Sequence, residues 1–323
     1  MRQIRITATG GPEVLELVDV AEPTPGPGEI KIRLGACGLN FIDTYQRSGL
    51  YPVPLPTGLG LEGAGTVEAV GEGVTRFRPG DRAGFCSGPP GAYAEAHCVP
   101  EARAVRLPDT ISDDVAAATL LKGLTAEFLV RRLWPLQAGD TVLFHAAAGG
   151  VGLLACAWLK SLGMRVIATV GSEAKAELAR AHGCEEIILY RTEDVPARVR
   201  ALTGGRGCKV VYDSVGRTTL PGSIQSAARR GLVVSYGNAS GPPDPVPPLL
   251  LSRHGSLFLT RPTLFDYVAE TAELDAAAGA LFAAIGDGTL KPLIGQRFAL
   301  DAAQAAHVAL ESRETVGSTI LVP

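Results

Sequence analysis

Short apolar runs alternate with segments of helical pattern from residue 140 onward, with helices expected over 172–182 and 192–203 among others. Six apolar strands joined by helical crossovers predict a doubly wound parallel sheet of the α/β class. The predicted strands are TVLFHA (141–146), RVIATV (165–170), EIILY (186–190), KVVYDSV (209–215), LVVSYG (232–237) and SLFLT (256–260).

The first 120 residues have a different texture, rich in glycine and proline. Their β-like runs are IKIRLGA, GAGTVEAVG, DRAGF and AEAHCV, separated by turn signals such as PGPGE and RPGD. Beyond residue 260 the pattern predicts helices over 267–285 and 300–312 and a strand over 317–322. This tail has no partner sheet of its own, so we expect it to rejoin the N-terminal unit.

Composition narrows the class of protein. A chain of 323 residues with 46% hydrophobic residues suits two domains with full cores. The formal net charge of −3 gives no basic field for nucleic acid or an anionic membrane, and the apolar runs are too short to span a bilayer. The N-terminal residues lack the apolar core of a signal peptide, and the six cysteines are scattered, so we expect a cytoplasmic location and reduced thiols.

The segment DTVLFHAAAGGVG, 140–152, carries the strongest chemical signal. It reads as a strand, a tight loop of small residues and a helix, with Ala147, Gly149 and Gly152 at the spacing of G-x-G-x-x-G. A small first residue permits the turn, Gly149 permits close approach to a pyrophosphate, and Gly152 lets the helix pack closely. The helix N-terminus would then donate N–H groups to the phosphates of a dinucleotide.

The end of the second predicted strand favours NADPH over NADH. An NAD site usually has an acidic residue there for the ribose 2′-hydroxyl, whereas this strand ends in Gly171 and Ser172, with Lys175 following. Gly171 leaves room for a 2′-phosphate, Ser172 and Tyr190 are candidate donors, and Lys175 adds positive charge. We expect Glu173 to cap the next helix. The alternative is that Lys175 and Tyr190 are ordinary surface residues.

The histidines and cysteines of the chain do not predict a metal site. The five histidines show no paired spacing, and no C-x-x-C occurs. His145, at the end of a strand beside the glycine loop, is predicted to be a packed or hydrogen-bonded structural residue.

Segments along the whole chain resemble the zinc-free medium-chain dehydrogenases/reductases, specifically the NADPH:quinone oxidoreductases of the zeta-crystallin type. The chain departs from the zinc-dependent relatives at Asn40, where they have a catalytic cysteine, and at Gly60-Leu61-Glu62, where they have Gly-His-Glu. Glu62 is expected to be a structural carboxylate. The matching segments are GGPEVLEL, GLNFIDTYQRSGLYP, GLGLEGAGTVEAVGEGV, PGDRAGF, LLKGLTAEFLV, FHAAAGGVG, VVYDSVG and LTRPTL.

The resemblance implies a GroES-like β domain, residues 1–123 and 263–323, flanking a Rossmann domain, residues 124–262. It implies that the NFIDTY segment lines the quinone site in the cleft between them. Asn40 would orient the nicotinamide or a carbonyl, and Tyr45 and Tyr51 would offer phenolic donors and flat faces. Packing roles stay open for both tyrosines, and Asp43 is either a turn residue or a partner that positions its neighbours.

Further cofactor contacts carry over by matching segment. Arg261 and Arg313 are candidate phosphate or adenine contacts, with surface salt bridges as the alternative for both. The remaining residues implied in this way are Thr125, Gly150, Val151, Ser214, Gly237 and Asn238.

The function expected is metal-free transfer of a hydride or electrons from NADPH to a small quinone. One alternative is an NADPH-dependent reductase of enones or enals, which differs only in the substrate pocket. A second is a non-catalytic protein that binds NADPH or RNA, against which the negative net charge argues. The resemblance also suggests a homodimer, with the last Rossmann strand, SLFLT, as the candidate edge for pairing.

Overall fold

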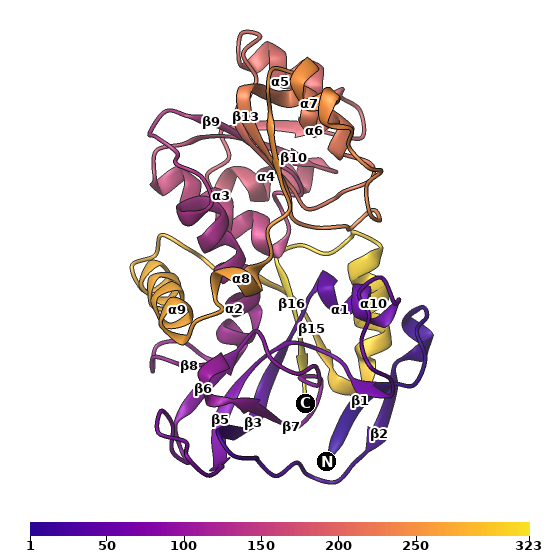
Figure 1. Ribbon diagram of the computed structural model, residues 1–323, viewed down its shortest axis with the longest axis vertical. Coiled ribbons are helices and arrows are strands. Elements are labelled where there is room, and N and C mark those ends of the chain that lie inside the picture. Colours follow the sequence, from indigo (N-terminus) through magenta and orange to yellow (C-terminus); the bar gives the residue numbers. More distant parts are fainter. The chain divides into compact units, whose positions relative to one another are not determined.

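The computed structural model describes residues 1–323 (Figure 1). The chain forms two compact units. The first unit comprises Met1–Leu124, Tyr267–Gly286 and Pro292–Pro323, and the second comprises Thr125–Asp266 and Asp287–Lys291. None of the helices is long and apolar enough to cross a membrane.

The second unit is built on a six-stranded parallel sheet, in the order β11-β10-β9-β12-β13-β14. The order runs outward in both directions from β9, which is the doubly wound arrangement, so the predicted α/β fold class is confirmed. The strands are β9 (Thr141–Phe144), β10 (Arg165–Val170), β11 (Glu186–Leu189), β12 (Cys208–Asp213), β13 (Ala227–Ser235) and β14 (Phe258–Thr260).

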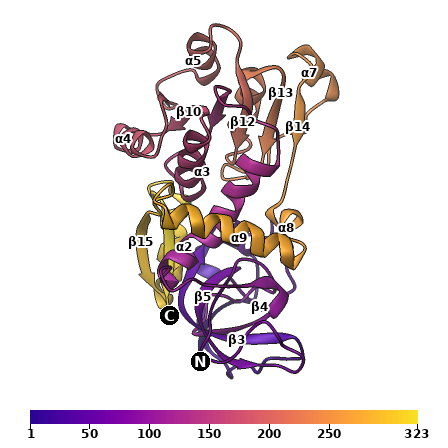
Figure 2. The same cartoon turned by 90° about the vertical axis from the view of Figure 1, so that its left-hand side faces the viewer.

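Helices connect the parallel strands and cover both faces of this sheet. Each crossover is right-handed, so the direction in which the chain moves along the sheet decides which face its helix covers. Helices α3 (Gly150–Ser161) and α4 (Glu173–Ala181) therefore lie on one face (Figure 2). On the other face α5 (Val195–Leu202) packs against α6 (Leu220–Ser226). Helix α7 (Pro248–Arg253) precedes β14. The central strand residues Leu143, Ile167, Val211 and Val233 are fully buried, as expected of strands covered on both faces.

One local prediction for α4 is wrong. We expected Glu173 to cap this helix, but the N-cap is Ser172, whose Oγ accepts the N–H of Lys175 at 3.4 Å. Serine is the better cap because its short hydroxyl reaches an unpaired N–H of the first turn. Glu173 is instead the first helical residue, where a carboxylate complements the helix dipole.

The first unit contains a seven-stranded and a three-stranded sheet. The larger has the order β15-β16-β3-β5-β6-β8, with β7 also paired to β3, and the smaller has the order β2-β1-β4. Its strands are β1 (Arg2–Ile6), β2 (Glu16–Asp19), β3 (Glu29–Leu39), β4 (Thr57–Gly58), β5 (Glu62–Val70), β6 (Arg82–Phe85), β7 (Ala96–Pro100), β8 (Ala104–Arg106), β15 (Ile294–Ala299) and β16 (Ser318–Val322).

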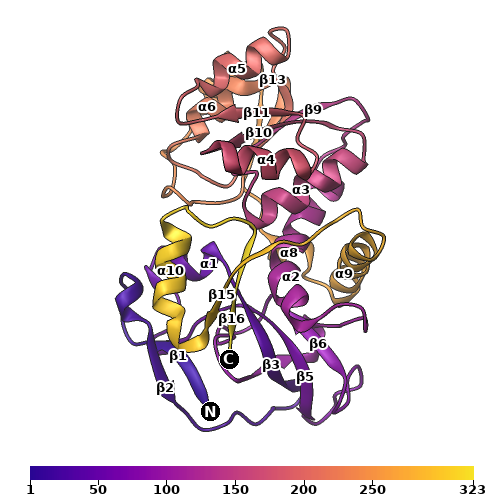
Figure 3. The same ribbon diagram turned by 180° about the vertical axis from the view of Figure 1, so that it is seen from behind.

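The C-terminal tail completes this larger sheet. Strand β16 pairs antiparallel with β3, with Ile320 opposite Gly38, and β15 pairs parallel with β16. Helices α1 (Phe41–Arg47) and α10 (Ala303–Glu311) lie side by side (Figures 1 and 3) and are joined by the ion pair of Arg47 and Glu311, 2.8 Å apart. The remaining helices are α2 (Asp113–Glu127), which crosses into the second unit, α8 (Leu264–Tyr267) and α9 (Thr271–Gly286).

Candidate active site

Asn40 lies at the junction of β3 and α1. It has extended backbone and serves as the N-cap of α1, while the carboxylate Oδ2 of Asp43 accepts its backbone N–H at 2.8 Å. This is the return bond of a capping box, in which the third helical residue reaches back to the cap. The side chain of Asn40 is 4% exposed, so its amide is held within the unit rather than left in solvent.

Glu62, the first residue of β5, fixes the amide of Asn40. Its Oε2 accepts the Asn40 Nδ2–H at 2.8 Å and the Lys122 ammonium at 3.2 Å, while its Oε1 accepts the Leu121 N–H at 2.7 Å. Gly38 leaves the space for this carboxylate, because a Cβ there would lie 2.0 Å from Oε2. Glu62 is fully buried, and its hydrogen bonds link β5 to α2 and to the N-cap of α1.

Asp43 is a second buried acid beside Asn40. Its Oδ2 also accepts the hydroxyl of Tyr93 at 2.7 Å, while its Oδ1 is buried with no hydrogen-bond partner. Burial raises the pKa of Asp43 to about 7, against the opposing effect of the Tyr93 hydrogen bond. The structure therefore places Asp43 in the helix cap of Asn40. The sequence reasoning missed Tyr93, which lies 50 residues away in a loop.

Tyr45 and Tyr51 lie together at α1 and the loop that follows it. Their ring centroids are 5.2 Å apart in an edge-to-face arrangement, and the backbone N–H of Tyr51 donates to the carbonyl of Tyr45 at 3.0 Å. Tyr45 is buried and Tyr51 half-buried. The structure thus brings all four residues predicted as catalytic, Asn40, Asp43, Tyr45 and Tyr51, to one helix and its flanking turns.

The glycine loop of the second unit runs from β9 into α3. Its one residue with positive φ is Ala146, at 54°, rather than Ala147, so the tight turn falls one position earlier than the motif suggested. Gly149 is the N-cap of α3. Gly152 makes the closest approach, because a Cβ there would lie 2.5 Å from the carbonyl oxygen of Ala146 and 2.6 Å from that of Ala147. The first N–H groups of α3, which begins at Gly150 and Val151, are the donors of an anion site.

Polar side chains gather at the end of β10. A Cβ on Gly171 would lie 2.7 Å from the hydroxyl of Tyr190 and 3.4 Å from Nε of Arg191, so both side chains reach across this glycine. Ser172 and Lys175 occupy the first turn of α4 directly after it. Arg191 is a cation that the sequence reasoning missed. The neighbouring Tyr190, already singled out at the end of its strand, was the signal that could have found it.

The chain after β13 is held by Arg261. Its guanidinium donates to the carbonyls of Ser235 and Gly237, both at 3.0 Å. The amide of Asn238 has the orientation that suits both Gly237 and Arg261. Its nitrogen donates to the Gly237 carbonyl at 2.9 Å and its oxygen accepts from Arg261 at 3.1 Å. A Cβ on Gly237 would lie 2.3 Å from the carbonyl oxygen of Ser214, so the loops after β12 and β13 pack backbone to backbone. These bonds go to carbonyls and an amide rather than to an acid.

Two further predicted cofactor residues lie elsewhere. Thr125 is a buried residue of α2 at the start of the second unit. Arg313 follows α10 in the first unit and has a φ of 61°.

A buried polar network supports the carboxyl ends of three strands. His145 contacts Thr169 Oγ1 at 3.0 Å and Ser223 Oγ at 3.1 Å, and Ser223 donates to Asp213 Oδ2 at 2.6 Å. The other oxygen of Asp213 accepts the N–H groups of the following turn, that of Gly216 at 3.0 Å among them. Burial lowers the pKa of His145. His145 is therefore a buried, hydrogen-bonded structural residue, as its position indicated.

Potential metal ligands are not gathered in this structure: no group of three or more histidine, cysteine, aspartate or glutamate side chains could hold an ion. The buried thiol of Cys37 donates to the carbonyl of Ala94, and burial raises its pKa to about 12.

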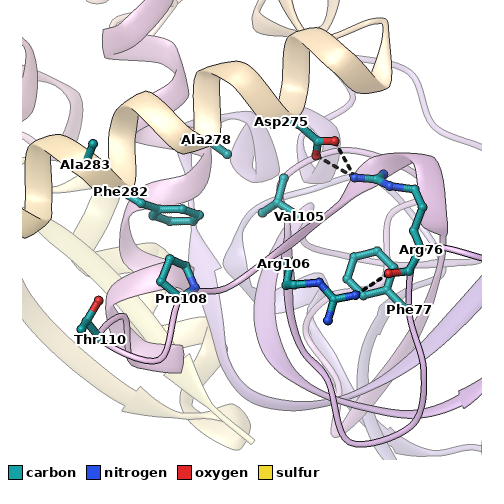
Figure 4. A pocket seen from close by; sticks show the side chains of 11 residues that line it. Arg76, Phe77, Val105, Arg106, Pro108, Thr110, Asp275, Ala278, Phe282 and Ala283 are labelled. Atoms are coloured by element: carbon teal, nitrogen blue, oxygen red, sulfur yellow. Dashed lines mark hydrogen bonds and ion pairs between the residues drawn. The ribbon is translucent and has the colours of Figure 1, made fainter.

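A surface pocket of the first unit lies between α9, strand β8 and the neighbouring loop residues 76–77 and 108–110 (Figure 4). Phe77, Val105, Pro108 and Phe282 give it an apolar lining, and none of the predicted site residues takes part. Its two arginines are already paired with acids, Arg76 with Asp275 at 2.6 Å and Arg106 with Asp81 at 2.8 Å. The pocket is therefore separate from the chemistry predicted here.

Known proteins resemble this chain along its full length. Residues 26–109 match the alcohol dehydrogenase GroES-like domain, and residues 150–277 match the zinc-binding dehydrogenases. A quinone oxidoreductase of Pseudomonas aeruginosa is 54% identical, with 100% of this chain and 99% of that protein covered. A 2-haloacrylate reductase of a Burkholderia species is 42% identical over 97% of this chain and 96% of that protein.

A crystal structure gives the same result for the fold. The quinone oxidoreductase of Escherichia coli complexed with NADPH is 45% identical and superimposes with a TM-score of 0.98, with 100% of both chains covered. The GroES-like and Rossmann folds implied by the sequence resemblance are thus confirmed. The chain belongs to the quinone oxidoreductase family of the medium-chain dehydrogenases/reductases and is an oxidoreductase.

Proposed function

We propose that this protein reduces a small quinone with NADPH and without a metal ion. The observation that carries the proposal is the environment of Asn40. Glu62 accepts three hydrogen bonds, from Asn40, Lys122 and the Leu121 N–H. The buried side chains at this position are therefore an amide, an ammonium and a carboxylate that already accepts hydrogen bonds. This combination suits hydrogen bonding to a polar ligand rather than zinc coordination.

The second unit offers a site that fits NADPH. The N-terminus of α3, with Gly149, Gly150 and Val151, presents N–H groups to the pyrophosphate. Ser172, Lys175 and Tyr190 form the site of the 2′-phosphate, and we add Arg191 because its Nε lies beside Gly171. The structure of the E. coli relative contains NADPH, which supports this assignment.

The other cofactor contacts follow the loops of the sheet. The nicotinamide half would be contacted by Thr125 of α2 and, beyond the carboxyl ends of the strands, by Ser214, Gly237 and Asn238. Arg261 would act mainly by holding Gly237 and Asn238 in place, because its guanidinium is already bonded there. Arg313 would contact the phosphate or adenine side.

NADPH supplies a hydride, so the protein's task is alignment and charge stabilisation. The quinone would lie against the ring faces of Tyr45 and Tyr51. The Asn40 amide and a tyrosine hydroxyl would donate to the oxygen on which negative charge develops. Asp43 would act indirectly, by fixing the backbone of Asn40 as the helix cap.

The protein would act as a homodimer. Strand β14 is the outermost strand of its sheet, and Phe258 on it is 51% exposed. An exposed apolar edge strand favours pairing with a second copy of itself about a two-fold axis. A cytoplasmic location completes the proposal, supported by six unpaired cysteines, a usage typical of a reducing compartment.

Reduction of an activated alkene is the second candidate. It is favoured by the 42% identity to a 2-haloacrylate reductase, whose substrate carries a conjugated double bond. Both reactions need the same hydride donor and a hydrogen bond to a carbonyl or carboxylate oxygen, so only the shape of the substrate pocket separates them.

A substrate panel distinguishes the candidates. NADPH oxidation is measured with benzoquinones, naphthoquinones, cyclohexenone and 2-chloroacrylate at equal concentrations. We expect kcat/KM for the best quinone to exceed that for the best alkene at least a hundredfold. The reverse ranking would replace quinone reduction by alkene reduction, and NADPH binding without turnover of either class would reject both.

A further inference from the structure

We propose that Glu62, paired with Lys122, is a positioning residue that sets the orientation of the Asn40 side-chain amide for catalysis. This inference rests on the proposed function for its kinetic consequence, but the orientation itself is a property of the first unit alone. All three side chains lie in that unit and are at least nine-tenths buried.

The orientation follows from hydrogen-bond chemistry. An amide carries a donor nitrogen and an acceptor oxygen of nearly equal size, so shape alone does not decide which of them faces a neighbour. An ionised carboxylate only accepts. Glu62 therefore requires the nitrogen of Asn40 to face it, at the observed 2.8 Å, and excludes the flipped amide.

Lys122 places a positive charge beside the buried carboxylate of Glu62. An isolated carboxylate in a fully buried position would be strongly disfavoured, and it would tend to take up a proton and become a donor as well. The Lys122 ammonium at 3.2 Å and the Leu121 N–H at 2.7 Å both donate to Glu62, and both bonds require acceptor oxygens there. Glu62 thereby stays an acceptor and keeps the amide of Asn40 in one orientation.

A second restraint acts on the backbone of the same residue. Asp43 holds the Asn40 N–H, and Tyr93 holds Asp43. Two buried acids thus restrain Asn40 at two different nitrogen atoms. A surface loop needs no such arrangement, whereas a residue that must present one amide group to a ligand within a few tenths of an ångström does.

The amide orientation is tested by NMR without substrate. The side-chain N–H resonances of Asn40 are identified by their loss in Asn40→Ala. In the wild type we expect one of the two protons to be shifted downfield and protected from exchange by at least tenfold relative to exposed asparagines. We expect this protection to disappear in Glu62→Gln, whose amide can either donate or accept. Unprotected Asn40 resonances in the wild type would overturn the proposal, even if Glu62→Gln failed to fold.

A double-mutant cycle tests the consequence for catalysis. We expect Glu62→Gln to lower kcat with a quinone at least tenfold while the Kd for NADPH changes less than threefold. In the Asn40→Ala background the same substitution should change kcat less than twofold, because no amide remains to position. Multiplicative effects of the two substitutions would show that Glu62 acts independently of Asn40 and would overturn the proposal.

The matched control is Glu185→Gln, which removes the acid of the exposed Lys160–Glu185 pair in the second unit. We expect its kcat and melting temperature to match the wild type. If the wild type reduces no quinone, the proposed function fails, and the NMR experiment still decides whether Glu62 orients Asn40.

Discussion

Side chains around Asn40 show how a site is specified by residues far apart in sequence. Asn40, Tyr45 and Tyr51 lie in one segment and were predicted as a group. Two supporting residues were not predicted. Tyr93 donates to Asp43 and Lys122 donates to Glu62, and both are brought there by the tertiary fold, which no local pattern encodes. Local chemistry therefore identified the groups proposed to meet a ligand, while tertiary structure was needed to find those that hold them.

Asp43 predicts a pH dependence of stability. Its pKa is about 7 in the folded protein and 3.8 ordinarily, so between these values the folded state keeps a proton that the unfolded state has lost. The contribution to stability is present in full below about pH 4 and is lost as pH rises through about 7, at about 1.4 kcal/mol per pH unit for one proton.

Denaturant unfolding at pH 5 and pH 7.5 measures this effect. The wild type should lose roughly 2 to 3 kcal/mol more than Asp43→Asn between the two pH values. Asp109→Asn, at an exposed aspartate, should behave as the wild type does. An identical pH dependence in wild type and Asp43→Asn would show that Asp43 ionises normally in the folded protein.

Cofactor preference is a second prediction for single residues. Lys175→Ala and Arg191→Ala should each raise the KM for NADPH at least tenfold and the KM for NADH less than twofold, because only NADPH carries a 2′-phosphate. Arg180→Ala removes an exposed cation from the far end of the same helix α4 and should change neither value. Equal effects on both cofactors would remove Lys175 and Arg191 from the 2′-phosphate site.

At the scale of elements, the central strands β9, β10, β12 and β13 were predicted well because each is an apolar run that is largely buried on both faces. Several elements of the first unit were missed, among them β15 and α1. Strand β15 alternates between exposed and half-buried residues and contains glycine, glutamine and arginine, so it lacks an apolar signature. Helix α1 is seven residues long, too short to show a helical period, and its β-branched and aromatic residues favour strands.

The start of α3 carries a prediction about backbone approach. Gly152→Ala would place a methyl group 2.5 Å from a carbonyl oxygen, so the loop or the helix must shift. We expect a loss of about 1 to 3 kcal/mol in unfolding free energy and at least a tenfold weaker Kd for NADPH.

Gly279→Ala is the matched control, a helical glycine of α9 with no heavy atom within 4 Å of its added Cβ. It should leave NADPH binding unchanged and stabilise the protein by up to about 1 kcal/mol, because alanine is the better helix former. If Gly152→Ala behaved like Gly279→Ala, close packing at the glycine loop would not be needed for binding.

At the scale of the whole molecule, the exposed edge strand β14 predicts the oligomer. Sedimentation should give the wild type twice the chain mass of 33.6 kDa, and Phe258→Asp the mass of a single chain. Val308→Asp, which charges an equally exposed apolar residue on α10, should remain dimeric. A monomeric wild type, or a dimeric Phe258→Asp, would place the interface elsewhere or remove it.

Metal-free transfer from NADPH to a quinone is the central claim, and one measurement tests it most directly. NADPH oxidation by a naphthoquinone is followed with enzyme before and after exhaustive treatment with a chelator, and zinc is measured in both samples. We predict the same kcat in both and less than 0.1 zinc per chain. Loss of turnover on chelation, restored by zinc, would contradict the account.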